Sequence, residues 1–305
     1  MTHELPHDAK WPRAGNVFQT DLDRADVALL GVPAHRTSIS PTNAHATPAA
    51  VRNALLRYST YAADVDVDLQ QLTALDAGDI EEPDGADGEQ RTIDAVQRLL
   101  GHTPLTLIIG GDNSVTFAGA RGVAAAHGQD LSDIGLITFD AHHDLRDGIS
   151  NGSPVQRLIE AGLRGSNVVQ IGIADFANSR EYAMRARDHG ITIISRAQLR
   201  EIGPAAAIAQ AAKQMGKRTI YVDVDMDVCD RAVVPACPAA MPGGISADEL
   251  RQLVRAVAML PGVRAMDFTE VDATADARDQ RTVRLTALAI LEAMTGFAMR
   301  KEVRR

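Results

Sequence analysis

Titratable side chains gather at one point of the chain, directly after the apolar segment 134–139. The sequence "DAHHD" places Asp140, His142 and Asp144 at alternate positions, so an extended backbone would point these three side chains the same way. Two carboxylates beside an imidazole form a mixed oxygen and nitrogen site that suits Mn²⁺ or another divalent first-row ion. The alternative interpretation is a solvated turn after a strand. For His143 two roles are open, a hydrogen bond to a metal ligand or exposure to solvent, and we expect exposure.

A second acidic cluster follows another apolar segment. The sequence "DVDMDVCD" contains four aspartates, Asp223, Asp225, Asp227 and Asp230. Carboxylates this close repel one another strongly unless a cation neutralises them or they stay protonated. Because both clusters follow apolar segments, we expect them to serve one cation site. Bridging carboxylates with terminal His and Asp ligands are able to hold two metal ions about 3.5–4 Å apart.

Short apolar segments alternate with amphipathic helical patterns along the chain, and they must position these clusters. The helical patterns include residues 47–58, with Thr47 as N-cap, and residues 246–260, which open with a capping box from Ser246 to Glu249. The alternation predicts a largely parallel sheet covered on both faces. The β-branched segments that predict buried strands are 26–33, 104–110, 134–140, 167–173, 190–195, 218–225 and 263–272.

The carboxyl ends of such strands are where ligands bind in parallel sheets. Three endings stand out by their Asp, His or Asn residues: "LIIGGDNS", "LITFDAHHD" and "IYVDVDMDVCD". The polar segment 81–90 is the expected loop, and it is too short to divide domains. We therefore predict one α/β domain over residues 1–305.

Composition excludes several classes of function. The 305 residues carry a formal net charge of −9, which argues against a nucleic-acid or membrane surface as partner. The N-terminal segment has no apolar core of a signal peptide, and only Cys229 and Cys237 contain thiols, so we expect a protein of the reducing cytoplasm. We expect Cys229 to be a small buried residue and not a nucleophile.

Three sequence blocks together resemble the signatures of the ureohydrolases, the family of arginases, agmatinases and formimidoylglutamases. The blocks are "GGDNS" (110–114), "DAHHD" (140–144) and "DMDVCDRAVVPACPAAMPGG" (225–244). The corresponding family patterns are G-G-D-H-S, D-A-H-x-D, and D-x-D-x-x-D followed by a proline-rich loop that ends in Gly-Gly. The resemblance covers about residues 26 to 295 and implies a three-layer α/β/α fold with a binuclear manganese site. It also implies a homo-oligomer, a trimer or hexamer.

The resemblance implies a role for each site residue. Asp140 and Asp225 would bridge two Mn²⁺ ions, and a metal-bridging hydroxide would attack the carbon of a small amidine or guanidine substrate. Asp227 would also steer the proton, and Glu270 would hold the cationic amidine by charge-assisted hydrogen bonds. A plain surface acid is the alternative for Glu270. The remaining ligands would be Asn113 and Asp144 at one metal, and His142 and Asp227 at the other.

Asn113 departs from the family pattern, because a histidine ligand normally stands at this position. An amide oxygen is a weaker donor than imidazole for Mn²⁺. We therefore expect the metal site shared by Asn113 and Asp144 to be the weaker one.

A second departure concerns the substrate. Asn151 stands where arginases and agmatinases have histidine, while Arg146 and the sequence "SNGSP" (150–154) resemble the formimidoylglutamase branch. Asn151 and Arg146 are the expected substrate contacts, with Arg146 clamping a carboxylate by its bidentate fork. A salt bridge from Arg146 to Asp144 or Asp147 is the alternative.

The leading hypothesis is a metal-dependent hydrolase that converts N-formimino-L-glutamate to L-glutamate and formamide in histidine breakdown. One alternative keeps the chemistry and changes the substrate, giving an agmatinase-like or other guanidino hydrolase that releases urea. Another is a metal-poor, catalytically silent family member that acts as a binding subunit, which Asn113 alone supports.

Overall fold

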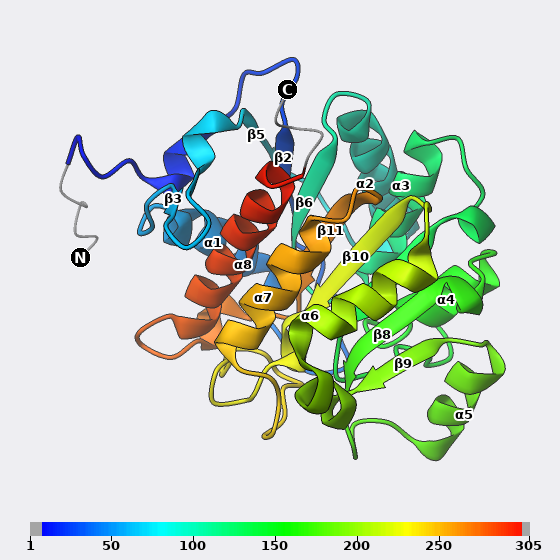
Figure 1. Cartoon of the computed structure of the whole chain (residues 1–305). Coiled ribbons are helices and arrows are strands. Elements are labelled where there is room, and N and C mark those ends of the chain that lie inside the picture. Colours follow the sequence, from blue (N-terminus) through cyan, green and yellow to red (C-terminus); the bar gives the residue numbers. More distant parts are fainter. Residues whose placement is uncertain (1–7, 301–305) are drawn as a thin grey trace.

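One parallel sheet of nine strands forms the centre of the computed structural model, which describes residues 8–300 (Figure 1). Every neighbouring pair of strands in it is parallel. A separate antiparallel pair joins β3 (Tyr61–Ala62) and β4 (Val67–Asp68). The order of the large sheet is β1 (Phe18–Gln19), β5 (Ala74–Asp79), β2 (Val27–Val32), β6 (Leu105–Gly110), β11 (Val263–Thr269), β10 (Ile220–Asp225), β7 (Gly135–Phe139), β8 (Val168–Ile173) and β9 (Thr192–Ser195).

Helices cover both faces of this sheet, and alternate strand residues separate into two apolar cores. Leu29 and Leu107 belong to the core under the first helix group, whereas Leu30 and Ile108 belong to the core under the second. Figure 1 shows α6, α7 and α8 in front of the sheet. The first group is α1 (Thr47–Leu55), α6 (Arg196–Met215), α7 (Ala247–Ala258) and α8 (Arg281–Ala298), and the second is α2 (Gly85–Leu100), α3 (Val115–Ala126), α4 (Pro154–Glu160) and α5 (Arg180–Asp188). The predicted three-layer α/β/α class is confirmed.

The seven predicted strands all occur, because β-branched apolar segments fit a sheet that is buried on both faces. The capping box of Ser246 and Glu249 also occurs at α7. Two local predictions are wrong. Thr47 lies inside α1, where its hydroxyl bonds the carbonyl of Val271 instead of capping the helix. The second half of the expected loop 81–90 is the first turn of α2.

Four adjacent central strands, β6, β11, β10 and β7, end at the same edge of the sheet. Their register places Phe268 of β11 beside Ile109 of β6 and Val224 of β10, and Val224 beside Phe139 of β7. Segments that are far apart in the sequence therefore leave the sheet side by side. Within the described residues, no helix is both long and apolar enough to span a membrane.

Candidate metal centre and substrate cavity

His142 and two aspartates form the tightest group of potential metal ligands. Nδ1 of His142 lies 2.7 Å from Oδ2 of Asp227 and 3.5 Å from Oδ1 of Asp140. One ligand atom from each of the three residues lies within 4.8 Å of the others. The geometry follows from the sheet, because Asp140 and His142 come directly after β7 and Asp227 comes directly after its neighbour β10.

The charges of this group fit a divalent cation. Oδ2 of Asp140 is buried and accepts no hydrogen bond from the described residues, and a cation would satisfy such an orphaned acceptor. Burial and the charge of Asp227 raise the pKa of Asp140 to about 6. Burial lowers the pKa of His142, but Asp227 and Asp140 raise it to about 12, so the metal-free imidazole is protonated. Although burial raises the pKa of Asp227, the His142 cation lowers it overall. A metal ion would take the place of that proton.

Asp225 and Asp144 bring two more carboxylates to the same cavity. Both are buried, and burial together with a neighbouring aspartate raises the pKa of each well above its usual value. Oδ1 of Asp225 accepts a hydrogen bond from the backbone N–H of Asp227 at 2.8 Å. The backbone of Asp144 is held in the left-handed region, with φ at 53°, which turns the chain at the site.

The two other aspartates of the second acidic cluster do not line this cavity. Asp223 is fully buried within β10, beside Asp267 of β11. The carboxylate of Asp230 accepts hydrogen bonds from the backbone N–H groups of Ala232 and Gly243, which fixes the proline-rich loop. The pair that reaches the cavity is therefore Asp225 and Asp227, as the sequence alignment with the family pattern predicts.

Asn113 is expected to be a metal ligand through its amide oxygen, and in this structure that oxygen has protein partners. Its amide oxygen lies within hydrogen-bond distance of the hydroxyls of Thr116, at 2.9 Å, and Thr269, at 3.1 Å. Its amide nitrogen donates to Oδ2 of Asp144. Asn113 thus presents donors to the site, and a role as metal ligand through its oxygen would require the amide to turn over.

Asn113 reaches the site because the glycines before it let two loops approach closely. A Cβ atom at Gly111 would lie 1.8 Å from the carbonyl oxygen of Ala34, so only glycine fits there. The backbone N–H of Asn113 then donates to Oε1 of Glu270 at 2.8 Å.

Glu270 follows β11 with a left-handed φ of 64° and is held by neutral donors. Nδ2 of Asn151 donates to the same Oε1 at 2.8 Å, while Oδ1 of Asn151 accepts from the backbone N–H of Ile39 at 3.0 Å. Burial and the charge of Asp112 raise the pKa of Glu270 to about 8. Glu270 is therefore a buried acid of the cavity and not a surface acid. Asn151 is expected to contact substrate. In this structure its amide oxygen is held by the backbone of Ile39, and its amide nitrogen orients Glu270.

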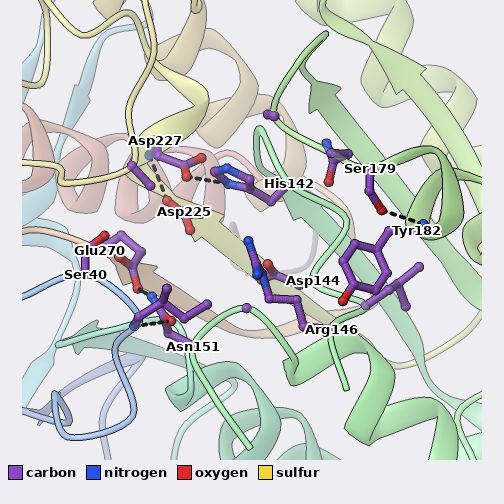
Figure 2. A pocket seen from close by; sticks show the side chains of 16 residues that line it. Ser40, His142, Asp144, Arg146, Asn151, Ser179, Tyr182, Asp225, Asp227 and Glu270 are labelled. Atoms are coloured by element: carbon purple, nitrogen blue, oxygen red, sulfur yellow. Dashed lines mark hydrogen bonds and ion pairs between the residues drawn. The ribbon is translucent and has the colours of Figure 1, made fainter. Parts of the chain in front are cut away.

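One cavity of about 290 Å³ is lined by most of these residues (Figure 2): His142, Asp144, Arg146, Asn151, Asp225, Asp227 and Glu270. The guanidinium of Arg146 forms no ion pair with any described residue. The two acids proposed as its alternative partners have other contacts, since Asp147 pairs with Arg185 at 2.7 Å and Asp144 accepts from Asn113. The salt bridge that was the alternative role for Arg146 is absent from the described part of the chain.

His143 and the two cysteines lie away from the chemistry. His143 is buried, contrary to its expected exposure, and its Nδ1 lies 2.7 Å from Oε1 of Gln170 on β8. This contact fixes the backbone between His142 and Asp144. Both cysteines are buried, and burial raises the pKa of each thiol, which agrees with the small apolar role expected for Cys229.

Sequence reasoning missed the wall of the cavity that follows β8. Asn178, Ser179 and Tyr182 form this wall. Ile39 and Ser40, from the loop after β2, also line the cavity. The rule that ligands bind beyond strand ends applies to β8 as well, but the sequence "ADFANSREY" has no group of His and Asp to draw attention to it.

Comparisons with known proteins agree with this architecture. Residues 25–296 match the model of the arginase family. A formimidoylglutamase of Halalkalibacterium halodurans is 37% identical over 297 residues, which cover 93% of this chain and 92% of that protein. The crystal structure of a Bacillus subtilis formimidoylglutamase superposes with a TM-score of 0.91 at 32% identity, covering 98% of this chain and 96% of that one. A Trypanosoma cruzi formiminoglutamase solved with Mn²⁺ has a TM-score of 0.87 at 26% identity, covering 95% and 99%.

Proposed function

The chain belongs to the arginase family, as its three sequence blocks predicted, and we propose that it hydrolyses the amidine C–N bond of N-formimino-L-glutamate. Water is consumed, and the products are L-glutamate and formamide. The observation that carries this proposal is the mixed charge of the cavity lining, in which buried carboxylates lie together with Arg146, a cation that forms no ion pair with any described residue. N-formimino-L-glutamate carries the complementary charges: a cationic amidine on its α-nitrogen, one carboxylate on the α-carbon and a second carboxylate at the end of the side chain.

We propose two Mn²⁺ ions as cofactor, and this number is supported by the buried carboxylates, which outnumber the one imidazolium among them. Asp140, His142, Asp144, Asp225 and Asp227 would hold the ions. When bound, manganese supplies a water-derived nucleophile near neutral pH.

The remaining steps fall to side chains of the chain itself. Glu270 would hold the amidine by charge-assisted hydrogen bonds, and the approaching cation would favour the ionised form of its carboxylate. Asn151 and the backbone N–H of Asn113 keep Oε1 of Glu270 in place for this contact. Asp227 would pass a proton toward the leaving nitrogen, and Arg146 would hold a substrate carboxylate.

The two rival functions fit the cavity less well. Agmatine and other guanidino compounds without a carboxylate would leave Arg146 unpaired. A silent binding subunit has no use for a cavity lined by four acids, Asp144, Asp225, Asp227 and Glu270. A homo-oligomer in the cytoplasm, acting on a small soluble substrate, completes the proposal and rests on the family resemblance and on the two free thiols.

The test is glutamate release from N-formimino-L-glutamate by metal-stripped protein titrated with Mn²⁺. We expect release that depends on Mn²⁺ and saturates with it. Urea release from agmatine or 3-guanidinopropionate, without glutamate release, would replace the proposal by the guanidino hydrolase. Absence of product from every substrate at saturating Mn²⁺ would favour the silent subunit.

A further inference from the structure

Tyr182 on α5 is a cavity residue that has no part in the proposed chemistry. It lines the same cavity as Arg146, and Figure 2 shows it on the opposite side of Arg146 from Glu270. Its backbone N–H donates a hydrogen bond to Oγ of Ser179, the N-cap of α5. Its phenol hydroxyl makes no hydrogen bond with any described residue. The hydroxyls of Tyr58, Tyr61 and Tyr221, by contrast, all bond to protein acceptors. A half-buried phenol at a cavity wall normally has a partner for its O–H, and here the cavity is where that partner can lie.

Helix α5 is tied to the segment that carries Arg146. Nη1 of Arg185 donates to the carbonyl of Leu145 and to Oδ1 of Asp147, each at 2.7 Å, so it contacts the residues on both sides of Arg146. The guanidinium carbon of Arg185 also lies 5.4 Å from the centre of the Tyr182 ring. One cation therefore fixes Arg146 and Tyr182 relative to each other.

The loop before α5 is tied to the metal-ligand segment in the same way. Oδ1 of Asn178 accepts from the backbone N–H of His143 at 2.9 Å, and its Nδ2 donates to the carbonyl of Ala141 at 3.0 Å. The distance from the metal ligands to Tyr182 is thereby set by side-chain hydrogen bonds on both sides of His142. Because this distance is fixed, the cavity is able to discriminate between substrates of different length.

We infer that Tyr182 is a specificity residue that donates a hydrogen bond to one carboxylate of the substrate while Arg146 binds the other, and that Arg185 positions both. The inference rests on the proposed hydrolysis of N-formimino-L-glutamate. The two carboxylates of this substrate lie at different distances from its amidine, one on the α-carbon and one at the end of the side chain, so they need two separate anchors. A phenol and a guanidinium on the wall of one cavity supply them. The site would then select amidines with two carboxylates over those with one.

The first experiment compares Tyr182→Phe with the wild type in the Mn²⁺-loaded protein. We expect KM for N-formimino-L-glutamate to rise about tenfold, which is the usual loss of one hydrogen bond to a charged group. The kcat and the Mn²⁺ affinity should stay within about twofold, because Tyr182 is not expected to contact the reacting atoms. Tyr61→Phe is the matched control, since it removes a phenol hydroxyl that bonds Asp66 outside the cavity, and its KM should equal that of the wild type.

Two analogues separate recognition from structure. N-formimino-L-glutamine has a neutral amide in place of the side-chain carboxylate, and 4-formimidoylaminobutyrate lacks the α-carboxylate. The KM penalty of Tyr182→Phe should disappear for one analogue and persist for the other. An equal penalty on both would assign Tyr182 a structural role and overturn the inference.

Arg185→Met and Arg185→Lys test the positioning role. We expect Arg185→Met to raise KM several-fold with little change in kcat, and Arg185→Lys to recover part of the loss, because the ammonium is able to donate to Leu145. An unchanged KM in Tyr182→Phe with an active wild type overturns this inference alone. A wild type that releases no glutamate overturns both this inference and the proposed function.

Discussion

The two halves of the candidate metal centre are built from the same sheet edge but differ in what they offer a cation. In one half, His142, Asp140 and Asp227 converge. A proton on the His142 imidazole lies between it and the Asp227 carboxylate, where a metal ion would bind. On the other half, the amide nitrogen of Asn113 donates to Asp144, so the ligand carboxylate is already satisfied by a neutral donor.

The difference shows that ligand type alone does not decide metal affinity. At the His142 half a metal ion displaces one proton, and it then finds three ligands, His142, Asp140 and Asp227, already gathered. At the other half, a metal ion must compete with a hydrogen bond, and the donor that makes it is held from behind by Thr116 and Thr269. We therefore expect the His142 half to bind Mn²⁺ first and the Asn113 half to bind it more weakly.

The largest effect should come from breaking the His142 half. Asp227→Asn removes a ligand and the negative charge, and the expected result is a loss of glutamate release of about a thousandfold with at least about a hundredfold weaker Mn²⁺ binding. Calorimetric Mn²⁺ titration together with a glutamate assay measures both. Near-normal Mn²⁺ binding by this variant would mean that the two halves do not differ as described.

Making the two halves alike is the next test. Asn113→His supplies an imidazole and removes the donor to Asp144, so the weaker Mn²⁺ site should tighten about 30-fold, within the range of changes at metal-site neighbours. The number of Mn²⁺ ions retained after dialysis, measured by atomic emission, reports the change. If dialysis removes the same fraction from variant and wild type, Asn113 does not limit the second site.

The proton on His142 predicts a pH dependence of metal binding. Its raised pKa, about 12, means that the metal-free protein carries this proton at every pH from 7 to 9. Because Mn²⁺ needs the neutral imidazole, the apparent affinity should rise by about tenfold per pH unit in that range for each proton released. Titrations in two buffers of different ionisation enthalpy count the protons.

Asp227→Asn is also the control for the proton count. This substitution removes the charge that does most to raise the pKa of His142. The variant should therefore release fewer protons for each Mn²⁺ ion that it binds. An affinity independent of pH in the wild type would contradict the exchange of proton for metal.

The smallest effect concerns the support behind Asn113. Thr269→Val removes one hydroxyl from its amide oxygen, and the freed amide should turn more easily toward a metal ion. We expect Mn²⁺ affinity at the weaker site to rise about threefold. The free energy of unfolding should fall by about 1 kcal/mol. Thr286→Val, which removes a buried hydroxyl bonded within α8, is the matched control and should change only stability.

The sequence predicts the parts of the molecule that depend on local pattern. Apolar β-branched segments predicted seven strands, and the aspartates at the ends of β7 and β10 predicted where the candidate metal ligands gather. β5 was missed because its segment "ALDAGD" has no β-branched residue and includes two aspartates that pair with Arg52 of α1.

What the sequence could not predict depends on contacts between distant segments. The orientation of Asn113 is decided by Thr269, 156 positions away, and the burial of His143 depends on Gln170 of the next strand. No local signal distinguishes an amide that coordinates from one that donates, because the residue and its neighbours in sequence are the same in both cases.

The position of β11 has a consequence for biosynthesis. It is the last strand of the sheet along the chain, yet it lies in the middle, between β6 and β10, and it carries Glu270. A nascent chain that lacks β11 has a gap between the segments of Asn113 and Asp225, and parallel pairings of such sequence separation form slowly. The site can therefore assemble only when the final strand inserts, so competence for metal and substrate arrives late and as a single event after translation of that segment.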